Sequence, residues 1–182
     1  MREYNKPKHF IDEYRRLFSE FKEKKGRILE IGIQKGGSLK LWEDWLPEFQ
    51  VIGVDILECK EFETKRIKTL QMDQTDKRIL DYAPFDIIID DGGHKMSEQI
   101  SSFRMLYPNL NKGGLYIIED LNSSYWDEFW DQELKTTDFL KGLVDDVNKD
   151  AYLMKSRCHL EPREFYEIES IKFLKYLCVI QK

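Results

Sequence analysis

The chain has 182 residues, of which 41% are hydrophobic and 35% are charged, and its formal net charge is -5 at pH 7. A chain of this length can bury the core of one domain and cover that core with charged side chains. The negative charge offers no broad attraction to nucleic acid or to an anionic membrane. No apolar run approaches the roughly 18 residues of a membrane span. We therefore expect a soluble globular protein with neither nucleic acid nor a membrane as its partner.

The cysteines and the N-terminus indicate the compartment. Cys59, Cys158 and Cys178 are odd in number, widely spaced and without a CxxC pair. This usage predicts neither a disulfide framework nor a zinc knuckle. The N-terminal sequence is charged from its second residue, unlike an export signal. We expect a cytoplasmic protein.

Helix and strand patterns alternate along the first two thirds of the chain. Apolar residues recur at helical spacing over 10–21, 39–46 and 96–106, and 78–83 is a short helical pattern. Five strand patterns lie between them, namely RILEIG, QVIGVD, RIKTLQM, FDIIIDD and GLYIIED. Such alternation predicts βαβ units and therefore a doubly wound α/β fold with a parallel sheet.

The end of the chain breaks this alternation. A helical pattern covers 134–147, and two strand patterns follow over 163–174 and 176–182. The two strands are separated by so few residues that only a hairpin can join them. We therefore expect the sheet to finish with an antiparallel hairpin.

Two acidic clusters follow the fourth and fifth predicted strands. The sequence DDGGH begins at Asp90, and the pair ED begins at Glu119. The carboxyl ends of parallel strands line the ligand crevice of an open sheet, so the clusters should meet at one edge. Carboxylates gathered there predict a metal site. A structural alternative is that Asp90 and Asp91 only cap the helix that begins near Met96.

The turn after the first strand indicates the kind of cofactor. Residues 30–38, EIGIQKGGS, lack the GxGxxG pattern that accommodates a pyrophosphate. Asp55 ends the second strand, where a carboxylate can bind ribose hydroxyls. Asp73 and Gln74, after the third strand, offer an acceptor and an amide to an adenine edge. A ribose and an adenine without a pyrophosphate favour S-adenosylmethionine over a nicotinamide dinucleotide.

Together these motifs resemble a known family. EIGIQKGGS, VIGVD, MDQTD, IIIDDGGH and GGLYIIEDLNSSYW are similar to class I S-adenosylmethionine methyltransferases, and most of all to the metal-dependent sugar O-methyltransferases of macrolide antibiotic pathways. The similarity runs from Arg27 to Trp126 and returns in the terminal hairpin. We expect one Rossmann-like domain over residues 1–182, composed of an N-terminal helix in 1–25, a cofactor and metal-binding core in 27–126, and a helix with the closing hairpin in 127–182.

The resemblance implies which residues hold the cofactor. It places the methionine end of S-adenosylmethionine beside Glu30, Gly32 and Ser38. The ribose would lie beside Asp55, and the adenine beside Asp73 and Gln74. A carboxylate inside an apolar strand is also unfavourable unless it is partnered, which independently favours a ligand role for Glu30.

The resemblance also implies a metal site with a base beside it. A magnesium-like ion lies between the two acidic loops in the family, which makes Asp91, Glu119 and Asp120 the expected ligands. His94 matches the general base proposed for the family. Oxygen-only ligands favour Mg²⁺ or another hard divalent cation over zinc. A structural alternative for His94 is a hydrogen bond to neighbouring backbone.

The chemistry of these residues agrees with methyl transfer. The acceptor oxygen must be aligned with the methyl group and made more nucleophilic. A cation bound to adjacent hydroxyls lowers the pKa of one of them, and a histidine can accept its proton. We therefore expect a divalent-metal-assisted O-methyltransferase that acts on a hydroxylated small molecule, such as a sugar or a sugar-bearing metabolite.

Several alternatives stay open at this point. Vicinal phenolic hydroxyls would use the same metal geometry, as in a catechol-type methyltransferase, and a non-catalytic S-adenosylmethionine-binding protein would have the same cofactor motifs. Tyr125, Trp126, Phe129 and Trp130 could form a wall of an acceptor pocket, or a plain core or subunit contact. The oligomeric state is also open, with a homo-oligomer as one alternative.

Overall fold

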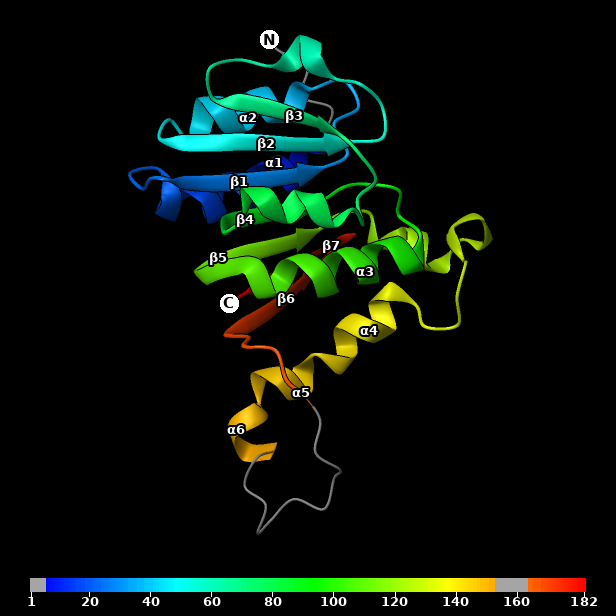
Figure 1. Ribbon diagram of the computed structural model, residues 1–182. Coiled ribbons are helices and arrows are strands. Elements are labelled where there is room, and N and C mark those ends of the chain that lie inside the picture. Colours follow the sequence, from blue (N-terminus) through cyan, green and yellow to red (C-terminus); the bar gives the residue numbers. More distant parts are fainter. Residues whose placement is uncertain (1–5, 153–163) are drawn as a thin grey trace.

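The fold is an α/β sheet that is parallel except for a closing hairpin. The computed structural model describes residues 6–152 and 164–182. Its seven-stranded sheet has the order β3-β2-β1-β4-β5-β7-β6 (Figure 1). Strands β1 to β5 are parallel, and β7 is antiparallel to both β5 and β6. The predicted fold class is confirmed. The strands are β1 (Gly26–Ile31), β2 (Phe49–Asp55), β3 (Ile67–Gln71), β4 (Phe85–Asp90), β5 (Leu110–Ile118), β6 (Ser170–Leu174) and β7 (Leu177–Gln181).

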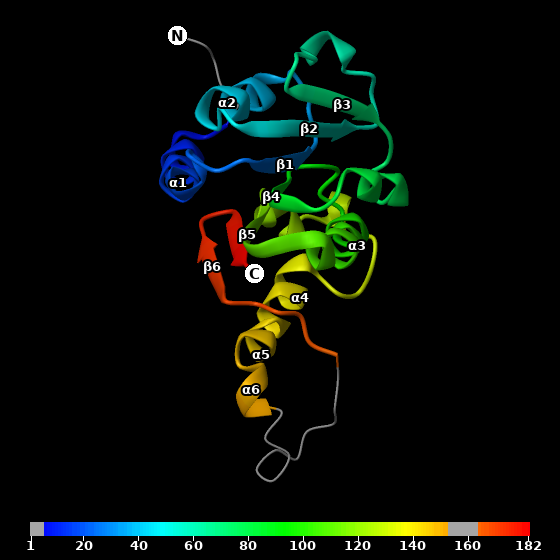
Figure 2. The same ribbon diagram turned by 60° about the vertical axis from the view of Figure 1, so that its left-hand side comes forward.

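Helices cover both faces of the sheet. Helices α1 and α2 lie on one face, and α3 and α4 lie on the other (Figure 2). The α-helices are α1 (Lys8–Phe18), α2 (Gly37–Trp45), α3 (Met96–Leu106), α4 (Thr136–Gly142), α5 (Val144–Val147) and α6 (Lys149–Tyr152). Short 3₁₀ helices connect them, namely η1 (Ser19–Phe21), η2 (Lys60–Phe62), η3 (Lys77–Tyr82), η4 (Tyr107–Asn109), η5 (Leu121–Tyr125) and η6 (Asp127–Phe129).

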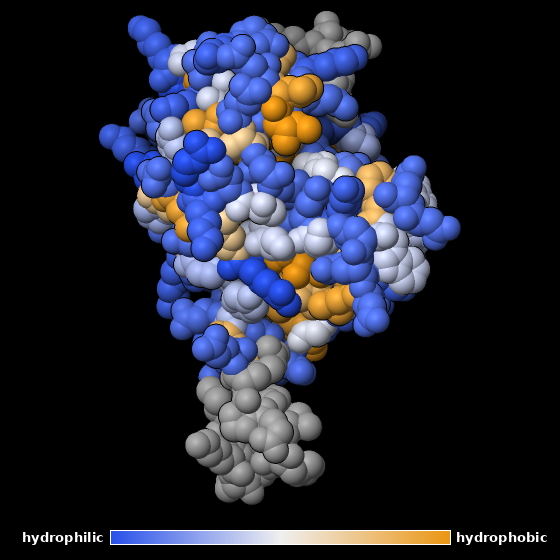
Figure 3. All heavy atoms as spheres, turned by 45° about the vertical axis from the view of Figure 1, so that its right-hand side comes forward, coloured by the Kyte–Doolittle hydropathy of each residue, from blue (hydrophilic) through white to orange (hydrophobic). Residues whose placement is uncertain are grey.

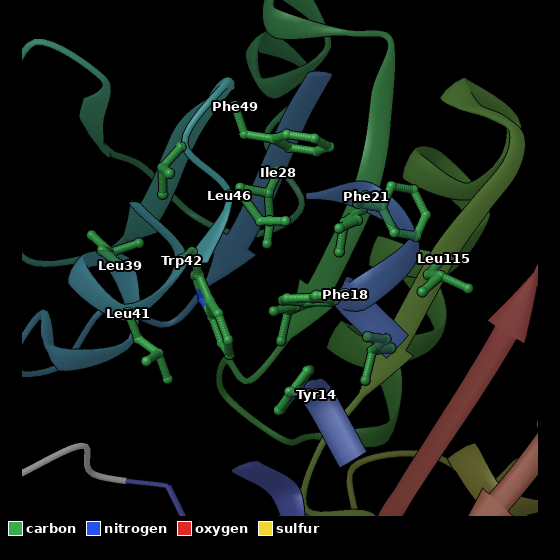
Figure 4. Packing of buried hydrophobic residues seen from close by; sticks show 14 of the residues in the cluster. Tyr14, Phe18, Phe21, Ile28, Leu39, Leu41, Trp42, Leu46, Phe49 and Leu115 are labelled. Atoms are coloured by element: carbon green, nitrogen blue, oxygen red, sulfur yellow. The ribbon is translucent and has the colours of Figure 1, made fainter. Parts of the chain in front are cut away.

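The first layer of the core joins α1 to α2. Phe10, Tyr14 and Phe18 recur every four residues along α1 and are buried against the sheet. Such a stripe is the apolar face of an amphipathic helix. The rings of Tyr14 and Phe18 point toward Trp42 of α2, with centroid distances of 4.9 and 5.1 Å (Figure 4). This packing fixes α1 along one face of the sheet, with Tyr14 near Glu119 at the carboxyl edge and the following Phe21 against Phe49 at the start of β2.

The second layer is organised around Phe103 of α3. Its ring stacks on Tyr107 at 4.7 Å and makes edge contacts with Tyr116 of β5 at 5.1 Å and Phe139 of α4 at 5.3 Å. Aromatic pairs of this kind add to the apolar area that they bury. Phe103 therefore ties α3 and α4 to the sheet.

Two predicted elements differ from the structure. Strand β6 begins at Ser170, whereas the pattern predicted a strand from 163; residue 163 lies outside the described residues. Further back, the Tyr166 N–H donates to the Asp146 side chain and the Glu167 carbonyl accepts from the Tyr107 hydroxyl, and the backbone bonds to β7 only from Glu169, whose N–H donates to the Gln181 carbonyl at 2.8 Å. The helix predicted over 134–147 is divided into α4 and α5.

The remaining surface and thiol features are simple. Figure 3 shows a face on which hydrophilic side chains dominate and apolar side chains form small separate areas. Within residues 6–152 and 164–182, no helix is long and apolar enough to span a membrane. Cys59 and Cys178 are buried free thiols, and Cys158 lies outside the described residues.

Phe18→Ala tests the packing of α1. Removing this buried ring should leave a cavity and lower the free energy of unfolding by about 3 kcal/mol. The matched control is Phe173→Ala on β6, where the side chain is 46% exposed and the change should stay within about 0.5 kcal/mol. Urea unfolding followed by circular dichroism measures both. Equal losses in the two variants would contradict this packing.

Candidate functional site

The two acidic loops lie side by side at the carboxyl edge of the sheet. Asp90, the last residue of β4, is in register with Ile31 of β1 and Ile118 of β5. The sheet register continues one residue further, because the Asp91 N–H donates to the Ile31 carbonyl at 3.0 Å and the Glu119 N–H donates to the Asp90 carbonyl at 2.9 Å. The two clusters are therefore neighbours.

A cavity of about 630 Å³ opens at this edge. Every predicted site residue except Glu30 lines it, namely Gly32, Ser38, Asp55, Asp73, Gln74, Asp91, His94, Glu119 and Asp120. Glu30 lies in β1 and is fully buried. The residues predicted for the cofactor and those predicted for the metal thus share one cavity, which is the arrangement that a transfer reaction between two bound groups requires.

The chain leaves β1 through a turn that only glycine can form. Gly32 has a φ of +87°, and a Cβ atom there would lie 2.0 Å from the carbonyl oxygen of Asp91. Asp55 fixes the next residues, since its Oδ2 accepts from the N–H groups of Ile33 at 2.8 Å and Gln34 at 3.2 Å. The Leu57 N–H donates to Oδ1 at 2.9 Å, and since a carboxylate has about four acceptor positions, Asp55 can still accept one hydrogen bond from a ligand.

Gln74 holds the DDGGH loop in place through hydrogen bonds. Its side-chain carbonyl accepts from the Gly93 N–H at 2.8 Å, and its NH₂ group donates to Ser102 of α3 at 2.9 Å. The side chain is buried. Both polar ends of Gln74 are therefore used within the protein, and its predicted contact with adenine stays a prediction.

Three acidic side chains converge on one ammonium group. Lys6 Nζ lies 3.2 Å from Glu30 Oε1, 2.8 Å from Asp91 Oδ2 and 2.6 Å from Glu119 Oε1. The Lys6 side chain is only 5% exposed. One positive charge thus faces three acidic groups, and this imbalance makes the edge of the sheet attractive to further cations.

Burial and charge act against each other in this cluster. Desolvation raises the pKa of Glu30 and of Glu119, and the positive charge of Lys6 opposes that rise. Burial alone would lower the pKa of Lys6, but the charges of Glu30, Glu119 and Asp91 reverse the effect and hold it above its ordinary value. Lys6 is therefore a persistent cation within the site.

The core helices donate the remaining hydrogen bonds to these acids. The Tyr14 hydroxyl of α1 donates to Glu119 at 2.5 Å, and the Trp42 Nε1–H of α2 donates to Glu30 Oε2 at 3.0 Å. Buried charged groups are tolerated only when such partners are present. Sequence reasoning predicted neither Lys6 nor Tyr14 as a site residue. A hydroxyl on an otherwise apolar helix face is the one signal that marks Tyr14.

A second group of side chains converges beside the acids that surround Lys6, namely Asp91, His94 and Asp120. One ligand atom from each of the three lies within 4.8 Å of the others. His94 Nε2 is 3.8 Å from Asp120 Oδ2, and both residues have a left-handed φ, +61° and +52°. Non-glycine residues in this region are uncommon and are enriched at functional sites. Within the described residues, the buried His94 Nδ1 has no hydrogen-bond partner.

These observations fit a divalent cation. The lysine ammonium already stands where carboxylates converge, and Asp91 and Asp120 supply the oxygen atoms that hard ions prefer. Burial and the negative charge of Asp91 raise the pKa of Asp120. Glu119, the third predicted ligand, lines the same cavity but faces Lys6 and Tyr14 here.

The helix-cap interpretation of the DDGGH acids is wrong. At the start of α3, the Ser97 N–H donates to Asp131 at 3.1 Å. Asp90 instead accepts from the Gly92 N–H within its own loop, at 3.4 Å. Burial raises the pKa of Asp90 to about 7. Asp90 therefore stabilises the DDGGH loop and does not cap α3.

The aromatic segment after β5 is not a plain core. Tyr125, Trp126 and Trp130 are 65%, 50% and 51% exposed. The ring of Phe129 makes an edge contact with His94 at 5.9 Å, which puts the segment beside the cavity. The alternatives of an acceptor wall and a subunit contact remain.

Comparison with known proteins identifies the family. The FtsJ-like methyltransferase family matches residues 2–141. The chain belongs to this family. The predicted membership of the methyltransferases is confirmed.

Two curated relatives and one solved structure show where within the methyltransferases the similarity lies. Mycinamicin VI 2''-O-methyltransferase of Micromonospora griseorubida is 38% identical over 156 residues, covering 76% of this chain and 39% of the relative. The tetracenomycin relative of Streptomyces olivaceus, 8-demethyl-8-alpha-L-rhamnosyl tetracenomycin-C 2'-O-methyltransferase, is 34% identical over 185 residues, covering 93% and 49%. The structure of MycE methyltransferase from the mycinamycin pathway, in complex with Mg, SAH and mycinamycin VI, matches with a TM-score of 0.83 and 31% identity over 95% of this chain.

The resemblance to sugar O-methyltransferases is thereby confirmed, although this methyltransferase chain spans less than half the length of these relatives. It covers 39% and 49% of the two curated proteins and 48% of the MycE chain.

Gly32→Ala tests the close approach of the two loops. The added Cβ would collide with the Asp91 carbonyl and would occupy a left-handed φ, so we expect the free energy of unfolding to fall by about 2 kcal/mol or more. The matched control is Gly142→Ala in α4, where a Cβ meets nothing within 4 Å and helix propensity favours alanine by up to about 1 kcal/mol. Chemical unfolding of both variants gives the comparison. A neutral Gly32→Ala would contradict the geometry of this turn.

Proposed function

We propose that this chain is an S-adenosylmethionine-dependent O-methyltransferase that uses Mg²⁺ or another hard divalent cation to methylate a hydroxyl of a sugar or sugar-bearing small molecule. The observation that carries the proposal is the convergence of Asp91, His94 and Asp120 at the edge of the cofactor-sized cavity. The names of the similar proteins support it, because they are sugar O-methyltransferases and MycE was solved with Mg and SAH.

The polar residues that line the cavity are arranged in an order that suits S-adenosylmethionine. Gly32 and Ser38, at the glycine turn, would adjoin the methionine end, with Glu30 buried behind them. Asp55, at the end of β2, would bind the ribose through acceptor positions that the turn does not use. Asp73 and Gln74 line the part of the cavity beyond β3, where the adenine would lie.

The acidic loops would hold the ion on the other side of the cavity. Asp91, Glu119 and Asp120 are the proposed ligands, and the bound ion would lower the pKa of an acceptor hydroxyl. His94 would accept the proton at Nε2. The Asp120 carboxylate, 3.8 Å from Nε2, would stabilise the imidazolium that forms.

The aromatic segment supplies a surface for the acceptor. Phe129 lies against His94 and in turn contacts Trp126, with ring centroids 6.1 Å apart. Aromatic faces pack well on the C–H faces of sugars and other rings. We propose that this segment forms one wall of the acceptor pocket. The proposed partner is a small hydroxylated molecule, and the cytoplasmic location and the absence of a nucleic-acid partner stay predictions from the sequence.

Turnover with a panel of acceptors tests the function. Purified protein is incubated with S-adenosylmethionine, glycosides or catechols, and either Mg²⁺ or a chelator, and S-adenosylhomocysteine is measured. We expect release only when Mg²⁺ and a glycoside are both present. Turnover with catechols alone would support the catechol-type alternative. Cofactor binding without release under any condition would support a non-catalytic binding protein.

His94→Ala tests the base. We expect kcat to fall by about 10²- to 10⁴-fold, because a positioned general base contributes that much. Calorimetric binding of S-adenosylmethionine should be nearly unchanged. His9→Ala is the control, since His9 is exposed on α1. Unchanged turnover in His94→Ala would remove histidine from the mechanism.

Asp120→Asn tests the metal ligands. Loss of one ligand charge should weaken Mg²⁺ binding by on the order of tenfold. Asp81→Asn, at an exposed position of η3 that does not line the cavity, removes the same charge and should leave the affinity unchanged. Calorimetric titration with Mg²⁺ measures both. The assignment fails if the two variants bind Mg²⁺ equally well.

A further inference from the structure

Lys6 occupies a position that the proposed cation would need. The residue precedes Pro7 and α1, yet its ammonium reaches Asp91, 85 positions along the chain, and Glu119, 113 positions along. Asp91 and Glu119 are two of the three proposed metal ligands. The ammonium therefore takes two of the acceptor groups that a divalent cation would use.

The ammonium and a divalent ion would compete for the space between Asp91 Oδ2 and Glu119 Oε1. Mg²⁺ binds carboxylate oxygens at about 2.0–2.1 Å, and Lys6 Nζ already lies 2.8 Å from Asp91 Oδ2 and 2.6 Å from Glu119 Oε1. An ion bound between the same two carboxylates would stand in the space of the ammonium. Two positive centres so close together in a buried site repel strongly. An ion held by these two oxygens together and the present position of the Lys6 ammonium therefore exclude each other.

Lys6 can leave without disturbing the core. Phe10, Tyr14 and Phe18 hold α1 to the sheet, and Lys6 lies outside that helix. A lysine side chain has a flexible four-carbon stem and a strongly hydrated head group, so the released ammonium is stable in water. Only the Lys6 side chain needs to move.

The third contact of Lys6, with Glu30, links the displacement of Lys6 to cofactor binding. Glu30, 3.2 Å from Nζ, is the residue proposed to face the methionine end of S-adenosylmethionine, which carries an amino group. When Lys6 leaves, Glu30 loses its positive partner. The cofactor amino group and the divalent cation together could then replace the contacts of Lys6 with Glu30, Asp91 and Glu119.

We propose that Lys6 is an internal competitor for the divalent cation, which keeps the buried acids paired in the free protein and is displaced when the ion binds. This inference rests on the proposed function, because it concerns the same ligands.

Chemical labelling tests the displacement directly. Reductive methylation with formaldehyde and a borane reagent is followed at each lysine by peptide mass spectrometry, with chelator or with saturating Mg²⁺. We expect Lys6 to be protected in chelator and its labelling to rise severalfold with Mg²⁺. Lys8, exposed on α1, is the internal control and should not change. Unchanged or stronger protection of Lys6 in Mg²⁺ would overturn the proposal.

Lys6→Met tests the competition by affinity. Methionine keeps an unbranched side chain but removes the charge, so the Kd for Mg²⁺ should fall by about tenfold if the competent state is a minor one in the free protein. Lys8→Met is the matched control and should bind as the unaltered chain does. Thermal unfolding checks the fold, with Lys6→Met expected to be less stable in chelator and to recover with Mg²⁺.

The outcomes separate the two proposals. Equal Mg²⁺ affinity of Lys6→Met and the unaltered chain, or weaker binding by the variant, would overturn only the role of Lys6. Absence of Mg²⁺ binding to every variant would overturn the metal assignment in the proposed function as well, because nothing would then compete with Lys6.

Discussion

The structure depends on one electrostatic constraint, the pairing of buried and partly buried acidic groups at the carboxyl edge of the sheet. Glu30, Asp91 and Glu119 meet there around a single ammonium, that of Lys6. Such groups are unfavourable in a protein interior unless hydrogen bonds and opposite charges compensate them. The compensation comes from the core itself, because the helices that cover one face also carry the donors Tyr14 and Trp42. Packing and the chemistry of the site are therefore determined by the same helices.

The backbone contributes as much as the side chains. Gly32 lets β1 leave the sheet against the Asp91 carbonyl, and the left-handed His94 and Asp120 turn their loops toward each other. The closing hairpin adds a further restraint, since the Leu121 N–H donates to the Tyr176 carbonyl at the hairpin tip, directly after Asp120. These restraints come from elements far apart in the chain. They explain how a loop with unfavourable φ angles can be held in place before any ligand binds.

Much of the fold could be predicted from the sequence because its signals are local. Alternating periodicities and glycine or proline breaks indicated the parallel strands and the hairpin, and the meeting of Asp91 with Glu119 followed from the geometry of parallel strands. The contact of Lys6 could not be predicted, since no pattern relates a residue before the first helix to loops 85 and 113 positions away. The start of β6 was also missed, because it depends on where the backbone begins to bond to β7. The supporting role of Gln74 likewise depends on Ser102 and Gly93, from two other elements.

The most direct test of this account is a crystal structure of the chain with Mn²⁺ and S-adenosylhomocysteine, with the ion located by its anomalous scattering. Mn²⁺ is a hard cation that accepts the same oxygen ligands as Mg²⁺. We expect one anomalous peak bound by Asp91, Glu119 and Asp120, the nucleoside beside Asp55, and Lys6 moved away from the carboxylates. A structure with no peak at these residues, or with the Lys6 ammonium still between Asp91 and Glu119 beside a bound ion, would contradict it.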